Sequence, residues 1–239
     1  MTVSPCPSQP DLEHVSEWVF DLDNTLYPSS CNLFTQMDVR MRGFISNLLG
    51  VDADEAYRLQ KHYFREHGTT LSGLMKLHNV PPEDFLSHVH DLDVRVIPEN
   101  PALGAELARL PGRKQVFTNG TVAHAERVLT RLGIGQVFDD IFDIVHADYH
   151  PKPSAMSFSR FMARHGVDPS CAAMFEDLSR NLAPAHALGM TTVLVRPQEG
   201  HGDPAVRHWA EPGADADHVH YHTDDLAGFL STVRIRSTP

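Results

Sequence analysis

The sequence predicts an α/β protein in which a helical segment interrupts a mostly parallel sheet, and two patterns along the chain predict it. From about residue 96 onward, short apolar runs alternate with amphipathic helical segments, which is typical of a parallel sheet covered by helices on both faces. Residues 30–95 have helical periodicity instead, with no strand signal. We therefore predict a Rossmann-like core of residues 15–29 and 96–239, a helical insert of residues 30–95 after the first strand, and a flexible N-terminus over residues 1–14.

The first strand and the helical insert are predicted from their residue periods. The run Glu17–Asp21 (EWVFD) has the aromatic and β-branched residues of a buried strand. Apolar residues then recur every three to four positions from Leu33 to Leu49 and stop at Gly50, which predicts an amphipathic helix with a glycine end. A second helix begins after Asp52 with a carboxylate-rich first turn and ends near Gly68. Two further helical stretches cover Leu71–His78 and Glu83–His90.

The second half of the chain alternates between the two periods. The predicted helices cover residues 102–110, 122–132, 154–165 and 182–188. The predicted strands cover residues 114–117, 141–145, 172–175 and 191–195, with a weaker one at 219–222. We expect Gln198–Asp217, rich in Gly, Pro, His and Asp, to be a long surface loop.

The composition excludes several classes of protein. Of 239 residues, 41% are apolar and 21% charged, which are ordinary values for a folded globular protein. The net charge of −11 argues against a nucleic-acid polymer or an anionic membrane as partner, because both require a basic surface. Cys6, Cys31 and Cys171 are too few and too widely spaced for a disulfide framework. With no signal peptide or membrane span apparent, we expect a cytoplasmic protein, and the sequence does not predict its oligomeric state.

Residues able to do chemistry follow the predicted strands. In an open parallel sheet, ligands bind outside the carboxyl ends of the strands, so we expect these side chains to share one edge. They are Asp21 and Asp23 after the first strand, Thr118 and Asn119 after the second, Lys152 before the helix at residue 154, and Glu176, Asp177 and Asn181 after the fourth strand.

The types of these residues indicate phosphoryl transfer at a magnesium site. Three carboxylates form a hard oxygen site of the kind that Mg²⁺ prefers, and a carboxylate beside it can attack phosphorus. A second aspartate two residues on can protonate the leaving alcohol and later activate water. Thr118, the backbone at Asn119-Gly120, and Lys152 can stabilise charge on the phosphoryl oxygens.

Four short motifs carry a resemblance to a known family. Asp21-x-Asp23-x-Thr25, Thr118-Asn119, Lys152-Pro153 and Glu176-Asp177 resemble, in order, the four motifs of the haloacid-dehalogenase-like (HAD) hydrolase superfamily. The resemblance spans residues 17–197, and the insert is similar to the cap domain that this superfamily carries after its first motif. The stretches closest to pyrimidine 5′-nucleotidases are FDLDNTLYPSSCNLF, HGTTLSGLMKLHNV, HDLD, VFTNGTVAHAERVLTRLGI and FEDLSRNLAPAHALGM.

The resemblance implies a magnesium-dependent phosphomonoesterase that forms an aspartyl-phosphate. It implies that Asp21 is the nucleophile and that Asp23 is the general acid and base, with the Asp23 carbonyl also on the metal. It further implies that Asp177 is the third protein ligand of the metal. By the same match, the residues that hold the transferring phosphoryl group are Thr118, Asn119 and Lys152.

Two positions depart from the pattern of many relatives. Glu176 stands where many relatives have aspartate, and we expect it beside the metal ligands or as an optional ligand. Asn181 stands where many have a second aspartate, four residues after Asp177. A neutral amide there can orient a metal-bound water but adds no charge, so we expect modest metal affinity.

The insert should select the substrate, since the motifs recognise only phosphate. It has no basic cluster, but aromatic and hydroxyl groups lie near the predicted opening, and these suit a nucleobase with ribose. The expected substrates are the nucleoside monophosphates UMP and CMP. The expected substrate-contacting residues are Tyr27, Phe34, Thr69 and Thr70, with Gly73 in the same glycine- and hydroxyl-rich turn.

Other functions remain open at this point. The substrate can be another small phosphate monoester: phosphoglycolate, a sugar phosphate, FMN or pyridoxal phosphate. A haloacid dehalogenase is disfavoured because that chemistry has no use for the acid Asp23, and a non-catalytic binding protein because Asp21, Asp23, Lys152 and Asp177 are all present. His218, His220 and His222 alternate, so on a strand they would share one face. Such a trio can bind zinc, but we favour the interpretation that it is an exposed strand face.

Overall fold

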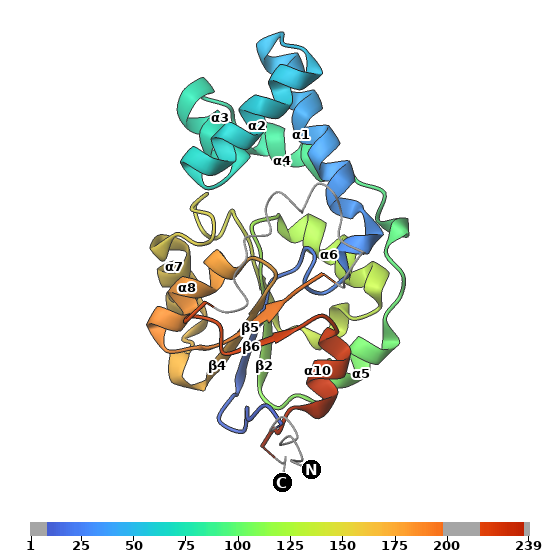
Figure 1. Cartoon of the computed structure of the whole chain (residues 1–239), viewed down its shortest axis with the longest axis vertical. Coiled ribbons are helices and arrows are strands. Elements are labelled where there is room, and N and C mark those ends of the chain that lie inside the picture. The colour runs from blue at the N-terminus through green and yellow to red at the C-terminus, as the bar shows by residue number, and fades with distance from the viewer. Residues whose placement is uncertain (1–8, 198–215, 237–239) are drawn as a thin grey trace, which may run out of the picture.

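The computed structural model describes residues 9–197 and 216–236, and it contains one sheet whose neighbouring strands all run parallel (Figure 1). The strand order is β3-β2-β1-β4-β5-β6. This confirms the predicted α/β, Rossmann-like class. The strands are β1 (Glu17–Phe20), β2 (Arg113–Phe117), β3 (Asp140–Phe142), β4 (Ala172–Glu176), β5 (Thr191–Val195) and β6 (Tyr221–Thr223).

Strand β1 lies at the centre of the sheet. It pairs with β2 on one side, where Glu17 faces Arg113, and with β4 on the other, where Glu17 faces Ala172. The strands that follow β1 in the chain are added first on one side of it (β2, β3) and then on the other (β4, β5, β6), which makes β1 a switch point of the topology. A crevice opens outside the carboxyl end of such a strand. Its residues Trp18, Val19 and Phe20 are fully buried, as expected for a parallel strand covered on both faces.

Helices cover both faces of the sheet (Figure 1). One face carries α5 (Pro101–Arg109), α6 (Val122–Leu132) and α10 (Leu226–Thr232), and the other carries α7 (Ala155–His165) and α8 (Ser179–Leu188). The short 3₁₀ helices are η1 (Ser29–Cys31), η2 (Val94–Val96), η3 (Gly135–Val137) and η4 (Pro169–Cys171).

Several predicted boundaries are wrong. The seven-residue helix α10 was not predicted, and α8 begins at Ser179 rather than at residue 182. The strand predicted to reach Val145 ends at Phe142 because the Asp143 carboxylate accepts hydrogen bonds from the backbone N–H groups of Val145 and His146, which turns the chain.

Four helices form the insert above the carboxyl edge of the sheet (Figure 1), with no strand between residues 30 and 95. The helix α1 ends at Gly50, whose φ of 66° is in the left-handed region, and Asp52 caps the next helix by accepting from the Glu55 N–H. Two segments, residues 21–32 and 90–100, connect the insert to the rest of the chain. Its helices are α1 (Leu33–Leu49), α2 (Ala53–His67), α3 (Thr70–His78) and α4 (Pro82–Val89).

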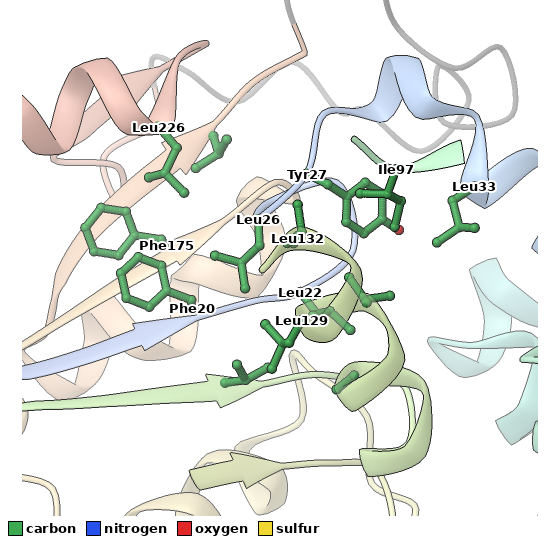
Figure 2. Packing of buried hydrophobic residues seen from close by; sticks show 14 of the residues in the cluster. Phe20, Leu22, Leu26, Tyr27, Leu33, Ile97, Leu129, Leu132, Phe175 and Leu226 are labelled. Carbon is green, nitrogen blue, oxygen red and sulfur yellow. The ribbon is translucent and has the colours of Figure 1, made fainter. Parts of the chain in front are cut away.

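The main hydrophobic cluster holds the loop after β1 in place. Phe20 of β1 stacks on Phe175 of β4 with ring centroids 4.6 Å apart, and Leu22 and Leu26 of the loop lie in the same cluster (Figure 2). Tyr27 is 1% exposed and lies in this cluster near Ile97 (Figure 2). The loop that carries the first motif is therefore anchored by apolar side chains on both sides of its polar residues.

The prediction of a flexible segment over residues 1–14 is wrong for residues 9–14. Leu12 is fully buried in the main cluster, and its backbone N–H donates to the carbonyl of Arg234. The predicted loop at 198–217 lies outside the described residues, except for Ala216 and Asp217. In the described ranges, no helix has the length and apolar character needed to cross a membrane.

Two of the three alternating histidines near β6, His218 and His220, have structural partners, and His222 is exposed. The His218 ring contacts the hydroxyl and carbonyl oxygens of Ser179, and the His220 ring contacts Thr192. These contacts tie the region before β6 to α8 and β5. Among the described residues they form no group able to hold a metal ion.

Candidate active site

A buried lysine joins two carboxylates at the carboxyl edge of the central strands. The Lys152 Nζ lies 2.7 Å from Asp21 Oδ1, 2.6 Å from Glu176 Oε2 and 2.7 Å from the carbonyl oxygen of Phe117. An ammonium has three donors, so each is used. Burial alone would lower the pKa of Lys152, but the two carboxylates outweigh burial and raise it.

The carboxylates around this lysine carry more negative charge than it neutralises. Burial and the nearby Glu176 raise the pKa of Asp21 to about 7, although Lys152 opposes the shift. Burial, followed by repulsion from Glu176 and Asp21, also raises the pKa of Asp177 well above its usual value. Such shifts indicate a site that lacks positive charge.

The donor set fits a divalent cation of the magnesium type. One carboxylate oxygen from each of Asp21, Glu176 and Asp177 lies within 4.8 Å of the others, and among the described residues this is the group able to hold a metal ion. The side-chain oxygen of Asn181 is buried beside this region without a hydrogen-bond partner. Hard oxygen donors of this kind are those that Mg²⁺ takes.

Glu176, expected beside the metal ligands or as an optional ligand, belongs to this cluster, whereas the carboxylate of Asp23 does not. The expected metal contact of Asp23 through its carbonyl stays a prediction.

The Asp23 carboxylate points instead toward two hydrogen-bond donors. Its Oδ1 accepts from the Tyr27 hydroxyl at 2.6 Å and lies 2.8 Å from Nε2 of His124. Burial raises the pKa of Asp23, but the charge of His124 and these hydrogen bonds outweigh burial and lower it. An ionised carboxylate only accepts, so the His124 ring donates.

The second and third motifs are joined through Asn119. Its Oδ1 accepts from the backbone N–H of Lys152 at 2.8 Å, and its Nδ2 donates to the Lys152 carbonyl at 3.3 Å. The side chain of Asn119 therefore holds the backbone of the lysine. The Thr118 hydroxyl accepts from the N–H of Gly120 at 2.9 Å. Phosphate binding by Thr118 and Asn119 stays a prediction.

A cavity of about 170 Å³ lies between these residues and the insert. Its floor is polar and includes Asp21, Asp23, Lys152 and Asp177. Its roof comes from the insert and is apolar apart from Thr69 and Thr70. The roof residues are Phe34, Met37, Met41, Phe64, Thr69, Thr70, Leu71, Phe85, Leu86 and Val89.

Two of the expected substrate residues do not line this cavity. Tyr27 is buried in the hydrophobic cluster, with its hydroxyl on Asp23. Gly73 packs against α2, where an added Cβ would lie 2.4 Å from Cβ of Tyr63. Thr69 and Thr70 do line the cavity, although the Thr69 hydroxyl also caps α3 by accepting from the N–H of Ser72.

Sequence reasoning missed three residues around the cavity. Arg180 lines it from the sheet side, and its guanidinium lies 4.1 Å from the ring centroid of Phe64. The sequence analysis expected only the insert to contact the rest of the substrate, and Arg180 lies outside the insert, in α8. His90 also lines the cavity, and His124 holds Asp23. His124 occupies the buried face of α6 with Ala125 and Val128, and a polar residue on such a face is a detectable signal.

An acidic cluster at the switch point of a parallel sheet, beneath helices inserted after the first strand, is the arrangement of an α/β enzyme whose ligand binds outside the carboxyl ends of the strands. Residues 19–189 match the haloacid dehalogenase-like hydrolases. The chain therefore belongs to the haloacid dehalogenase-like hydrolase family, and the predicted family is confirmed.

Two proteins of known name have sequences similar to this chain. Phosphate metabolism protein 8 of Saccharomyces cerevisiae is 29% identical over 207 residues, which cover 79% of this chain and 64% of that protein. Fructose-1-phosphate phosphatase YqaB of Escherichia coli is 36% identical over 81 residues, which cover 34% of this chain and 43% of that protein. The chain thus matches less than two thirds of the length of each relative.

The solved structures show that the fold is shared. A HAD phosphatase from Thermococcus onnurineus has a TM-score of 0.60 and 19% identity, over 92% of this chain and 100% of that one. The L-2-haloacid dehalogenase from Xanthobacter autotrophicus has a TM-score of 0.57 and 16% identity, over 91% of this chain and 97% of that one. Phosphatases and dehalogenases share this architecture, so the fold alone does not choose between them.

Proposed function

We propose that the protein is a magnesium-dependent phosphomonoesterase that acts through an aspartyl-phosphate, with the pyrimidine nucleotides UMP and CMP as its substrates. The observation that carries this proposal is the pair Asp21 and Asp23. One carboxylate lies against Lys152, and the other is held away from it by two donors, so their environments differ. Two carboxylates in different environments are suited to different roles.

In the first step, a carboxylate oxygen of Asp21 attacks phosphorus while the bond to the leaving alcohol breaks. Asp23 is ionised in the free protein, and the negative charge of the bound phosphate raises its pKa so that it takes up a proton on the oxygen that Tyr27 and His124 leave free. Asp23 then gives this proton to the leaving oxygen, and Lys152 stabilises the charge on the transferring group. In the second step, Asp23 takes a proton from water, which attacks phosphorus and releases Asp21 and inorganic phosphate.

The residues that would hold Mg²⁺ are Asp21, Glu176 and Asp177, with Asn181 beside them. When bound, the cation offsets the repulsion between these carboxylates and the phosphate. The donor set of the site supports this part of the proposal.

The apolar roof favours a substrate with an aromatic ring. Phe34, Phe64 and Phe85 bring aromatic surface to the cavity, and a pyrimidine base presents an apolar face with polar edges. The name of YqaB gives fructose 1-phosphate as the substrate of that relative, so a sugar phosphate is the alternative substrate class for this chain.

A panel of phosphate monoesters at subsaturating concentration tests the proposal. UMP, CMP, AMP, fructose 1-phosphate, phosphoglycolate, FMN, pyridoxal phosphate and an aryl phosphate are compared, with and without Mg²⁺, and Asp21→Asn is the blank. UMP and CMP should give the highest kcat/KM. A sugar phosphate about tenfold better would contradict the substrate, and no phosphate release from any ester would contradict the phosphatase activity.

The haloacid dehalogenase alternative is tested in parallel. Carbon–halogen cleavage has no use for a proton from Asp23, so the presence of this residue favours the phosphatase over the dehalogenase. A 2-chloropropionate assay should therefore give no chloride.

We also propose a cytoplasmic location without a nucleic-acid or membrane partner. The net charge of −11 and the free thiols of Cys31 and Cys171 support it.

A further inference from the structure

One face of α6 binds the segment that follows α4 at the end of the insert. The guanidinium of Arg127 donates to the carbonyl oxygens of His90 and Leu92, and the Thr121 hydroxyl lies 3.2 Å from Nδ1 of His90. Thr121 is the N-cap of α6, and Arg127 lies as far after His124 as Thr121 lies before it, so the three side chains meet this segment from one side of the helix.

His124 is the central residue of that face and has contacts on two sides. Its ring stacks on the ring of His90, with centroids 4.6 Å apart and planes 9° from parallel. Its Nε2 lies 2.8 Å from Asp23 Oδ1, and its side chain is fully buried. The same imidazole therefore contacts both the end of the insert and the carboxylate proposed as general acid and base.

The Asp23 carboxylate is fixed through one of its oxygens. Both the Tyr27 hydroxyl and the His124 ring are directed to Oδ1. Two donors on one oxygen set the rotation of the carboxylate, and the other oxygen is then the one available for proton transfer.

Packing alone does not account for a histidine at this position. The buried face of α6 is otherwise lined by Ala125, Val128, Leu129 and Leu132, and an aliphatic side chain would suit it. Burying an imidazole there leaves Nδ1 of His124 without a hydrogen-bond partner, which costs free energy. A group kept at such a cost points to a role beyond packing.

We propose that His124 is a positioning residue that aims the Asp23 carboxylate, and that the His90 ring holds His124 in place. This inference rests on the proposed function, in which Asp23 transfers protons. According to this inference, the orientation of the Asp23 carboxylate depends on the segment that joins the insert to the sheet.

The test compares His124→Leu, which loses the donor, with His124→Gln, whose amide can still donate to Asp23. Each is assayed on an aryl phosphate, whose leaving group needs little protonation, and on UMP, whose leaving alkoxide needs a proton. Rapid-quench measurements separate phosphorylation of the protein from its hydrolysis.

For His124→Leu we expect phosphorylation by the aryl phosphate to stay within about threefold of wild type, while UMP turnover and phospho-enzyme hydrolysis fall by about 100-fold, the scale of general acid–base catalysis. His124→Gln should recover most of that loss. His62→Leu, at an exposed position of α2, is the matched control and should change neither step.

Equal losses in both steps, or no recovery with glutamine, would overturn the inference, because a merely structural role predicts them. If His124→Leu does not fold, His124→Asn replaces it, since its shorter amide falls short of Asp23. Asp21→Asn is measured alongside: activity in that variant would contradict the proposed function, whereas an inactive Asp21→Asn with an unchanged His124→Leu would contradict only this inference.

The His90 contact is tested with a second pair. His90→Phe keeps a flat ring against His124 and should retain the wild-type ratio of the two steps. His90→Ala should shift that ratio in the same direction as His124→Leu but less. A shift in both variants, or in neither, would remove His90 from the inference.

Discussion

The Lys152 ammonium lies 2.7 Å from the carboxylate of Asp21, although 131 positions separate the two residues in the chain. The same ammonium lies 2.6 Å from Glu176 and is 1% exposed. Two carboxylates can be buried side by side here because one cation lies between them.

Lys152→Met should therefore destabilise the protein, because it leaves two buried carboxylates without their cation. We expect a loss of about 3–5 kcal/mol in the free energy of unfolding, the scale for breaking a buried ion pair. Urea unfolding in EDTA measures it. The double variant Lys152→Met/Glu176→Gln should recover part of the loss, and a single-variant loss below about 1 kcal/mol would contradict the interpretation.

Removal of divalent cations should abolish activity, because the repulsion among Asp21, Glu176 and Asp177 needs a cation to offset it. Binding should also be visible without turnover. Mg²⁺ at a hundredfold excess over its Kd should stabilise the protein by about 2.7 kcal/mol and raise Tm. Asp177→Asn should weaken that response. Full turnover in a chelated sample would refute the metal requirement.

Asp21→Asn should be folded but inactive, because the amide keeps the shape of the side chain and loses the attacking anion. Turnover of Asp21→Asn above a few per cent of the wild-type rate would exclude Asp21 as the nucleophile.

The metal-free wild type should lose stability as pH rises from about 4 to about 7, since the pKa of Asp21 is raised from 3.8 to about 7 and its ionised form opposes folding. The Asp21→Asn variant should lack that part of the pH dependence. Thermal unfolding in EDTA over this pH range measures the stability of both proteins.

Asp23→Asn should separate the two chemical steps. With an activated aryl phosphate it should form phospho-enzyme quickly and then stall, because water attack needs the missing base. Intact-mass measurement after a rapid quench would detect the trapped species. If both steps slow equally and nothing accumulates, Asp23 has another role.

Gly73→Ala should destabilise the insert, since the new Cβ would lie 2.4 Å from Cβ of Tyr63. We expect a loss of about 1–3 kcal/mol, typical of overpacking. Gly43→Ala in α1 is the control, because nothing lies within 4 Å of its added Cβ, and it should stabilise by about 0.5–1 kcal/mol. Thermal unfolding distinguishes them, and equal effects would contradict the packing.

The sequence was sufficient to locate the strands, although not all of their ends, and to identify the polar residues that follow them. Buried strands such as Ala172–Glu176 are short and apolar, and the switch point follows from strand order, so Asp21 and Asp177 could be expected at one edge. The side chain of Asp23 could not be placed, because its partner His124 lies 101 positions away and is brought there by the packing of α6.

Errors arose where a residue type suits two roles. Tyr27 has the ring and hydroxyl of a substrate contact, but it also suits a core position with one polar partner, and the structure has the latter. Gly73 suits a mobile turn, yet it allows the close approach of α2 and α3. Only the three-dimensional neighbours distinguish such roles.

The apolar roof and the charged floor of the cavity come from separate stretches of the chain. Substitutions in α1–α4 can change the shape of the roof without altering a strand, a carboxylate or Lys152. In evolutionary terms, selection can alter which molecules are accepted while the machinery for breaking their bonds is inherited unchanged. Residues 90–92 are the exception, because a change there would also disturb the contacts of α6.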